Sequence, residues 1–139
     1  MKQIAIFLIL SSILLGCSDP YLKNFETVGT NNSPEGALDF CEYKDGVLSA
    51  KGWSADKEDN APVEKVMIYI DNKALGKVTK KGIEREDVVK FFNNPAWIRS
   101  GWEIEANVPL TKGKHMAFAV SYDKAEAFSK TAEKEFTIK

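Results

Sequence analysis

The stretch GWEIEANVPLTKGKHMAFAVSY, residues 101–122, decides the fold class of this 139-residue chain. Apolar and polar side chains alternate from Trp102 to Val108, and the alternation resumes from Met116 to Tyr122 after the turn residues Thr111–Lys114. Because successive side chains of a β-strand point to opposite faces, this period of two is typical of strands with one buried face and one wet face. The stretch therefore predicts two half-buried strands joined by a turn.

Further strand patterns lie on the N-terminal and C-terminal sides of this stretch. Ala37–Tyr43 and Val47–Ser54 flank an Asp-Gly turn, the arrangement of a β-hairpin. Glu64–Asp71 is apolar on both faces, which indicates a central strand, and Ala74–Thr79 and Phe136–Ile138 add two more strands.

Seven such strands predict an all-β fold, a two-layer antiparallel β-sandwich, with a small barrel as the alternative. One segment departs from this pattern. The apolar spacing near residues 85–92 predicts one short helical turn, which Asn93-Asn94-Pro95 terminates.

The first residues have the order of an export signal. Lys2 is followed by twelve residues without a charge, Ile4–Leu15, too few to span a bilayer. Leu14-Leu15-Gly16-Cys17 resembles the lipobox of bacterial lipoproteins. That resemblance implies cleavage before Cys17 and a membrane anchor of lipid on the cysteine, the only non-protein group expected, with no other cofactor. Ser18 after the anchor implies the outer membrane if the organism is Gram-negative.

These features divide the chain into three parts. Residues 1–16 are predicted to be a lipoprotein signal peptide, and residues 17–34 a lipidated flexible tether, because Ser18–Pro34 is rich in Ser, Asn, Thr, Gly and Pro. Residues 35–139 then form one sandwich domain, large enough to bury a core without disulfides. If Cys17 carries lipid, Cys41 is unpaired, and we expect it to be a small apolar core residue rather than a reactive thiol.

The charge balance excludes one class of partner. The chain has 19 basic and 20 acidic residues, a formal net charge of −1. Binding to nucleic acid needs a basic face that displaces counterions, so no nucleic-acid partner is expected.

Four short motifs resemble an immunoglobulin-like sandwich module of bacterial secreted and surface proteins. They are Gly52-Trp53-Ser54-Ala55-Asp56, Arg85-Glu86-Asp87-Val88, Gly101-Trp102 and Gly113-Lys114-His115. The resemblance covers about residues 37–139 and implies a spacer, adhesion or substrate-presenting role without chemistry of its own. This sequence departs from the family pattern after Tyr122-Asp123, where Lys124-Ala125 replaces the usual turn glycine.

Candidate catalytic and metal-binding groups have a structural interpretation. His115 is the only histidine, so a catalytic triad would depend on it, and its place at a strand entry favours turn packing. The acidic clusters at residues 56–59 and 84–87 lie among lysines and are expected to be solvated loop charges. A calcium site in the loop 56–60 is the alternative for the first cluster, but its spacing matches no known loop motif. No metal site is therefore predicted.

Ligand binding is assigned to four residues. Arg85 and Asp87 are expected to fix their loop to the sandwich through a bidentate bond, with Asp56 as a further partner and ligand contact as the alternative. Trp102 fits the buried face of its strand, whereas Trp97, in a loop beside a proline, is the expected exposed platform for a sugar ring. Trp53 is the fourth candidate.

The sequence thus predicts a lipoprotein of the cell envelope that is not an enzyme. Its sandwich would be an interaction or structural module whose partner is an envelope protein or polysaccharide. The alternative is a carbohydrate-binding module that uses Trp97 with Arg85 or Asp87.

Overall fold

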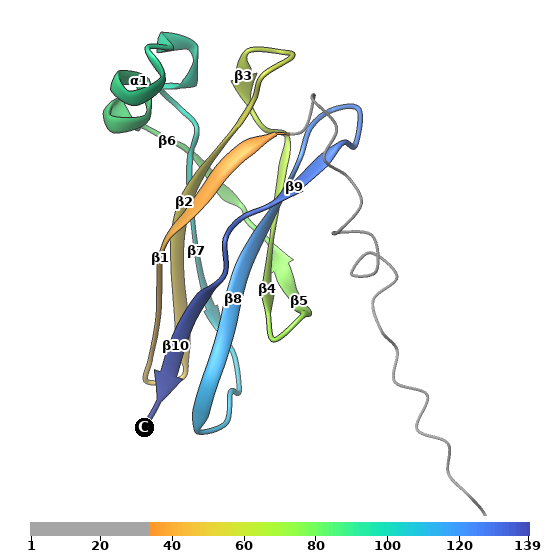
Figure 1. The fold of residues 1–139 in the computed structure, drawn as a ribbon. Helices are drawn as coiled ribbons and strands as arrows, with labels where there is room; N and C mark the ends of the chain where they lie inside the picture. The colour runs from red at the N-terminus through yellow and green to blue at the C-terminus, as the bar shows by residue number, and fades with distance from the viewer. Residues whose placement is uncertain (1–33) are drawn as a thin grey trace, which may run out of the picture.

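The computed structural model describes residues 34–139, which form two antiparallel β-sheets packed face to face (Figure 1). The first sheet has the order β1 (Glu35–Lys44), β2 (Val47–Asp56), β7 (Gly101–Asn107), β6 (Lys80–Ile83), with β3 (Ala61–Pro62) paired to β2. The second sheet has the order β10 (Lys134–Ile138), β8 (Gly113–Tyr122), β4 (Lys65–Ile70), β5 (Lys73–Lys77), with β9 (Phe128–Lys130) paired to β8. The predicted all-β, immunoglobulin-like sandwich is confirmed.

All seven predicted strands are present, and β3, β6 and β9 were not predicted. The β1–β2 hairpin has the expected Asp-Gly turn: Asp45 and Gly46 have φ angles of 51° and 84°. Two consecutive positive φ values match the twist of a type I′ turn to that of the flanking strands. This turn fixes the register in which Lys44 lies opposite Val47.

Alternate residues of β2, β7 and β4 point between the sheets and form the main core. Leu48, Val66, Ile68 and Trp102 are at most 2% exposed there. The core contains one polar link, because Trp102 Nε1 donates to Ser54 Oγ at 3.1 Å, and the Ser54 and Ser121 hydroxyls are 2.5 Å apart. Core packing of Trp102 is therefore confirmed, and the link joins one sheet to the other.

Strand β8 differs from the half-buried strand that the sequence predicts. Its small residues, Ala117 and Ala119, face the core, whereas Phe118 and Val120 point to the opposite face of the second sheet and are at most 1% exposed. On that face they form a second apolar cluster with Tyr69 of β4. The expectation of a wet face on β8 is wrong, because both of its faces are buried.

Between β6 and β7 the chain forms α1 (Glu86–Phe92) and the 3-10 turn η2 (Pro95–Trp97). The predicted helical turn is thus confirmed. Asn93 ends α1 in the left-handed conformation with φ of 49°, and the Asn94 side chain accepts a hydrogen bond from Ala96 N at 3.2 Å. Asparagine tolerates the left-handed region better than most residues, which explains why the helix stops there.

The edge strands β5 and β6 carry lysines, namely Lys73, Lys77, Lys80 and Lys81. The Lys80 ammonium pairs with Glu103 on the neighbouring strand, and the Lys81 ammonium donates to the main-chain carbonyl of Glu64. Lys73 and Lys77 are exposed.

The predicted signal peptide, the Cys17 anchor and the tether up to residue 33 lie outside the described residues. Within residues 34–139, no helix is both long enough and apolar enough to cross a bilayer.

Candidate functional site

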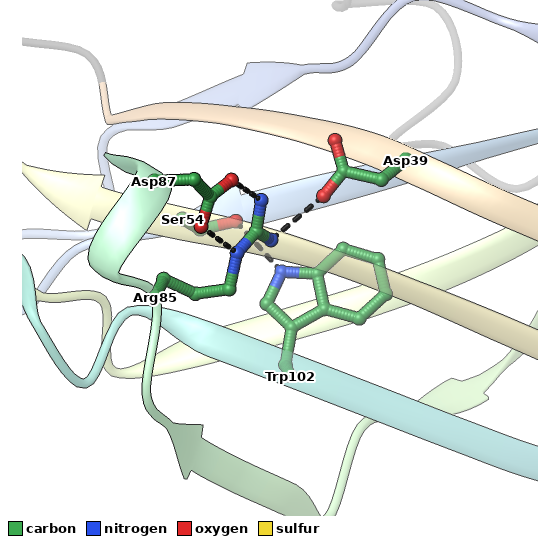
Figure 2. A network of polar contacts seen from close by, with 5 residues as sticks. All are labelled: Asp39, Ser54, Arg85, Asp87 and Trp102. Carbon is green, nitrogen blue, oxygen red and sulfur yellow. Dashed lines mark hydrogen bonds and ion pairs between the residues drawn. The ribbon is translucent and has the colours of Figure 1, made fainter. Parts of the chain in front are cut away.

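Arg85 connects the segment that carries α1 to the edge of the first sheet (Figure 2). Its Nε and Nη2 donate to the two carboxylate oxygens of Asp87 at 2.8 and 2.6 Å. Its Nη1 donates to Asp39 of β1 at 2.7 Å. Asp39 lies where β1 bulges between Leu38 and Phe40, and the bulge places its carboxylate beside the guanidinium. We call Arg85, Asp87 and Asp39 the Arg85 clamp.

The ion pair between Arg85 and Asp87 shifts the pKa values of both groups. Hydrogen bonds from Arg85 lower the pKa of Asp87 to about 2, and the same bonds raise the pKa of Arg85 above its ordinary value. Arg85 and Asp87 therefore both stay charged over the physiological range. The predicted bidentate bond is present.

The prediction that Asp56 is a further partner of Arg85 is wrong. Asp56 is 4% exposed, and its Oδ1 accepts hydrogen bonds from the main-chain N–H groups of Glu58 at 2.8 Å and Asp59 at 3.4 Å. It stabilises its own loop, because a short acidic side chain readily bonds to the backbone two and three residues further on.

Beside the clamp, the outer face of the first sheet has a shallow groove of about 330 Å³. Its floor is open partly because Gly101 has no side chain: a Cβ atom there would lie 2.9 Å from Cγ of Arg85. Phe40 lines the groove and is 42% exposed, and Lys51 and Glu103 form a charged rim. An exposed aromatic ring between charged groups can bind an apolar side chain or the face of a sugar ring.

The expectation that Trp97 is an exposed platform is wrong, because Trp97 is only 4% exposed. The η2 turn that begins at Pro95 folds the indole beneath α1, where its ring centroid lies 5.0 Å from that of Phe92 and 6.2 Å from that of Trp53. Trp53 is half-buried and also packs against Phe92 at 5.2 Å. These indoles join α1 to the end of β2, so Trp97 has no face available for a sugar.

His115 has the expected structural role. It is 6% exposed, its Nδ1 lies 2.6 Å from Asp71 Oδ2, and its Nε2 lies 2.7 Å from the carbonyl oxygen of Thr111. Both partners are hydrogen-bond acceptors, and only the doubly protonated ring can donate to both of them at once. The hydrogen bond to Asp71 raises the pKa of His115 in agreement with this geometry. The His115 ring thus joins the β4–β5 turn to the loop before β8.

Cys41 packs against the main core as a small apolar residue, as the sequence predicts. Desolvation raises the pKa of its thiol to about 11. The reactive thiolate is therefore a minor species near neutral pH.

Several side chains of the two acidic segments are paired within the domain. In the loop 56–60 Asp59 pairs with Lys124 at 3.2 Å, and Asn60 Oδ1 accepts a hydrogen bond from Asn94 at 2.6 Å. In the other segment Glu86 pairs with Lys90 at 3.3 Å. Across residues 34–139, no three His, Cys, Asp or Glu side chains are grouped so that they could hold a metal ion.

Sequence reasoning missed Asp39, Phe40, Lys51 and Glu103 as members of the site. They come from strands that are distant in sequence, and Arg85 and Asp39 are 46 residues apart. Phe40 was missed because alternation from Leu38 places it on the core face, whereas the bulge between Leu38 and Phe40 turns it outward.

A scan against protein-family models finds no match, and neither does a search of curated proteins. Among solved structures, fibronectin(III)-like modules of CbhA from Clostridium thermocellum are similar, with a TM-score of 0.52 and 15% identity over 78% of this chain. This chain spans about half, 47%, of that structure's length. A Family 28 exopolygalacturonase from Yersinia enterocolitica aligns at 12% identity with a TM-score of 0.38, over 73% of this chain and 20% of its own. The first likeness identifies the fold of residues 34–139 as a fibronectin(III)-like β-sandwich.

Proposed function

We propose that this chain is a lipid-anchored, non-catalytic interaction module of the bacterial cell envelope, and that it binds an envelope protein through the outer face of its first sheet. The observation that carries the proposal is the groove beside the Arg85 clamp. Phe40 is exposed in this groove, and Arg85, which also lines it, is held in place by carboxylates on two separate elements. Recognition surfaces commonly combine an aromatic anchor with a polar rim in this way.

A non-catalytic role is supported by how the described chain uses its reactive groups. Both ring nitrogens of His115 are engaged, and the thiol of Cys41 has a raised pKa. Arg85 and Asp87 neutralise each other. Each of these groups is engaged in contacts within the sandwich.

Binding to an envelope polysaccharide is the second candidate. Phe40 favours it, since an exposed aromatic ring flanked by Asp39 and Lys51 offers a sugar both an apolar face and hydrogen-bonding groups. In this form the alternative depends on Phe40 and no longer on Trp97.

The anchor is tested by Cys17→Ala. We expect this variant to lose fatty-acid labelling and to move to the soluble fraction, because two or three acyl chains are needed for stable membrane association. Lipid label that persists in Cys17→Ala would contradict the anchor.

The binding surface is tested by photo-crosslinking in intact cells. A photoreactive amino acid replaces Lys51 in the groove, and the matched control replaces Lys114 of β8, since both side chains are well exposed at 61% and 73%. We expect one discrete protein adduct from position 51 that Phe40→Ala weakens, and none from position 114. Equal crosslinking from both positions would refute the assignment of the groove. Retention of the wild type, but not of Phe40→Ala, on envelope polysaccharide would favour the second candidate.

A further inference from the structure

The end of the sandwich that carries α1 has an exposed apolar tip. Phe91 is 82% exposed, and Pro95 and Ala96 of η2 are exposed beside it. Phe92 is half-buried and packs edge-on against Phe91, with 4.9 Å between the ring centroids. We call these four residues the α1 tip. Trp53 and Trp97 pack against Phe92, so the segment that carries Phe91 is held by a packed aromatic cluster.

The α1 tip lies at the end where the chain enters the domain (Figure 1). The first strand residue, Glu35, pairs with Ala55 of β2, and Ala55 packs in one cluster with Val88 of α1 and Trp97 of η2. The opposite end carries the Asp45-Gly46 turn and the C-terminal strand residue Ile138, which pairs with Gly113. A chain anchored at Cys17 therefore enters the domain at the end that carries the tip.

The length of the proposed tether also indicates which end of the domain lies nearer to the membrane. A flexible tether of 17 residues, as proposed for Ser18–Pro34, would have a root-mean-square span of about 20–25 Å. The ten residues of β1 extend over about 33 Å. The end that carries the tip is thus the nearer one to the lipid.

Many of the charges at this end lie in ion pairs. The pairs are Glu84–Arg99, Glu86–Lys90, Asp87–Arg85, Asp59–Lys124 and Glu35–Lys57. Paired charges produce a weaker field at a distance than isolated charges do, and the apolar contact of Phe91 has to outweigh repulsion between an anionic bilayer and the remaining acidic groups, such as the exposed Glu58.

We propose that the α1 tip inserts into the interface of the membrane that holds the lipid anchor, with Phe91 as the inserted side chain; this inference rests on the anchor proposed above. A tether converts contact with the bilayer into an intramolecular step with an effective concentration in the millimolar range. Weak intrinsic affinity then suffices, and burial of one phenylalanine side chain shifts partitioning by about 10- to 100-fold. Insertion orients the groove beside Phe40 sideways from the membrane instead of leaving the domain free to rotate.

The test uses the full-length lipidated protein in vesicles of phosphatidylethanolamine and phosphatidylglycerol. An environment-sensitive fluorophore is attached at Ala96→Cys in the tip, or at Lys112→Cys at the opposite end, both exposed positions. Cys41 should label slowly because its thiol pKa is raised to about 11. Quenching by spin-labelled lipid then reports which end is in the bilayer.

We expect strong quenching at position 96 and little at position 112. Phe91→Ser should reduce the quenching at position 96 at least 5-fold, whereas the matched control Phe40→Ser, which removes the other phenylalanine that is exposed within residues 34–139, should leave it unchanged. Equal quenching at both ends, or no effect of Phe91→Ser, would overturn the proposal. A change in fluorescence at position 96 that appears only when envelope protein is added would also overturn it. Vesicle flotation is measured first: protein that does not float with the vesicles contradicts the anchor, whereas floating protein without tip quenching contradicts only the insertion.

Discussion

Removing the Arg85 side chain should loosen the segment carrying α1 from the first sheet. Three N–H groups of Arg85 lie 2.6–2.8 Å from carboxylate oxygens, and the side chain is 20% exposed. Its partners are more open, because Asp39 and Asp87 are 41% and 67% exposed. Solvent therefore screens both ion pairs, and each should contribute only about 0.5–1 kcal/mol.

The aliphatic stem of Arg85 adds to this contribution, because it packs over Gly101. We expect Arg85→Ala to lower the free energy of unfolding by about 2 kcal/mol in total. Arg85→Lys keeps the charge but loses the planar fork, so it should recover less than half of the loss. Urea unfolding followed by tryptophan fluorescence measures both variants.

A double-mutant cycle isolates the long-range part of the clamp. Arg85→Ala combined with Asp39→Ala should give a coupling of about 1 kcal/mol. Hydrogen exchange of residues 86–97 should speed up in Arg85→Ala more than exchange of β4 does, because the clamp holds that segment locally. If Arg85→Ala unfolds within about 0.5 kcal/mol of the wild type, or if the coupling is zero, the clamp does not stabilise the fold.

Three further predictions concern the core and the loops. The pKa of His115 is raised in the folded protein. Its stabilising effect is therefore fully present below the unfolded pKa of about 6.5 and disappears as the pH rises through the folded pKa. The urea midpoint should fall over this pH range in the wild type and stay flat in His115→Gln. Trp102→Phe removes the donor to Ser54 and leaves a cavity, so it should cost about 1–3 kcal/mol in thermal or urea unfolding, and an unchanged midpoint would contradict the polar link. Cys41 should react slowly with iodoacetamide at pH 8 and quickly in urea, as monitored by mass spectrometry; fast reaction of the folded protein would show that its thiol is not desolvated.

Local patterns predicted most of the strands, because each strand's alternation depends only on its own residues. The Asp45-Gly46 hairpin and the helical turn that ends at Asn93 belong to this class, since both rest on backbone conformations that those residues favour. Strand β6 was missed because its sequence Lys80-Lys81-Gly82-Ile83 is polar and lies at a sheet edge, where no alternation is required.

The site was harder to predict because its parts meet only in three dimensions. Arg85 and Asp87 are neighbours in sequence, and their bond was predicted, whereas Asp39 reaches them through a bulge in another strand. Trp97 misled the prediction because a proline and two asparagines usually mark an exposed loop. Here the same residues form a tight turn that directs the indole inward.

The lysines on the edge strands β5 and β6 have a consequence for how copies of the protein share a surface. With the proposed anchor in place, molecules would diffuse in two dimensions, where crowding would bring the unpaired strand edges of neighbours together far more often than in bulk solution. A partner strand approaching these edges would meet Lys73, Lys77, Lys80 and Lys81 and would have to desolvate their ammonium groups. We expect the domain to stay dispersed at high surface density for this reason, with its opposite flank and its groove left available to a partner.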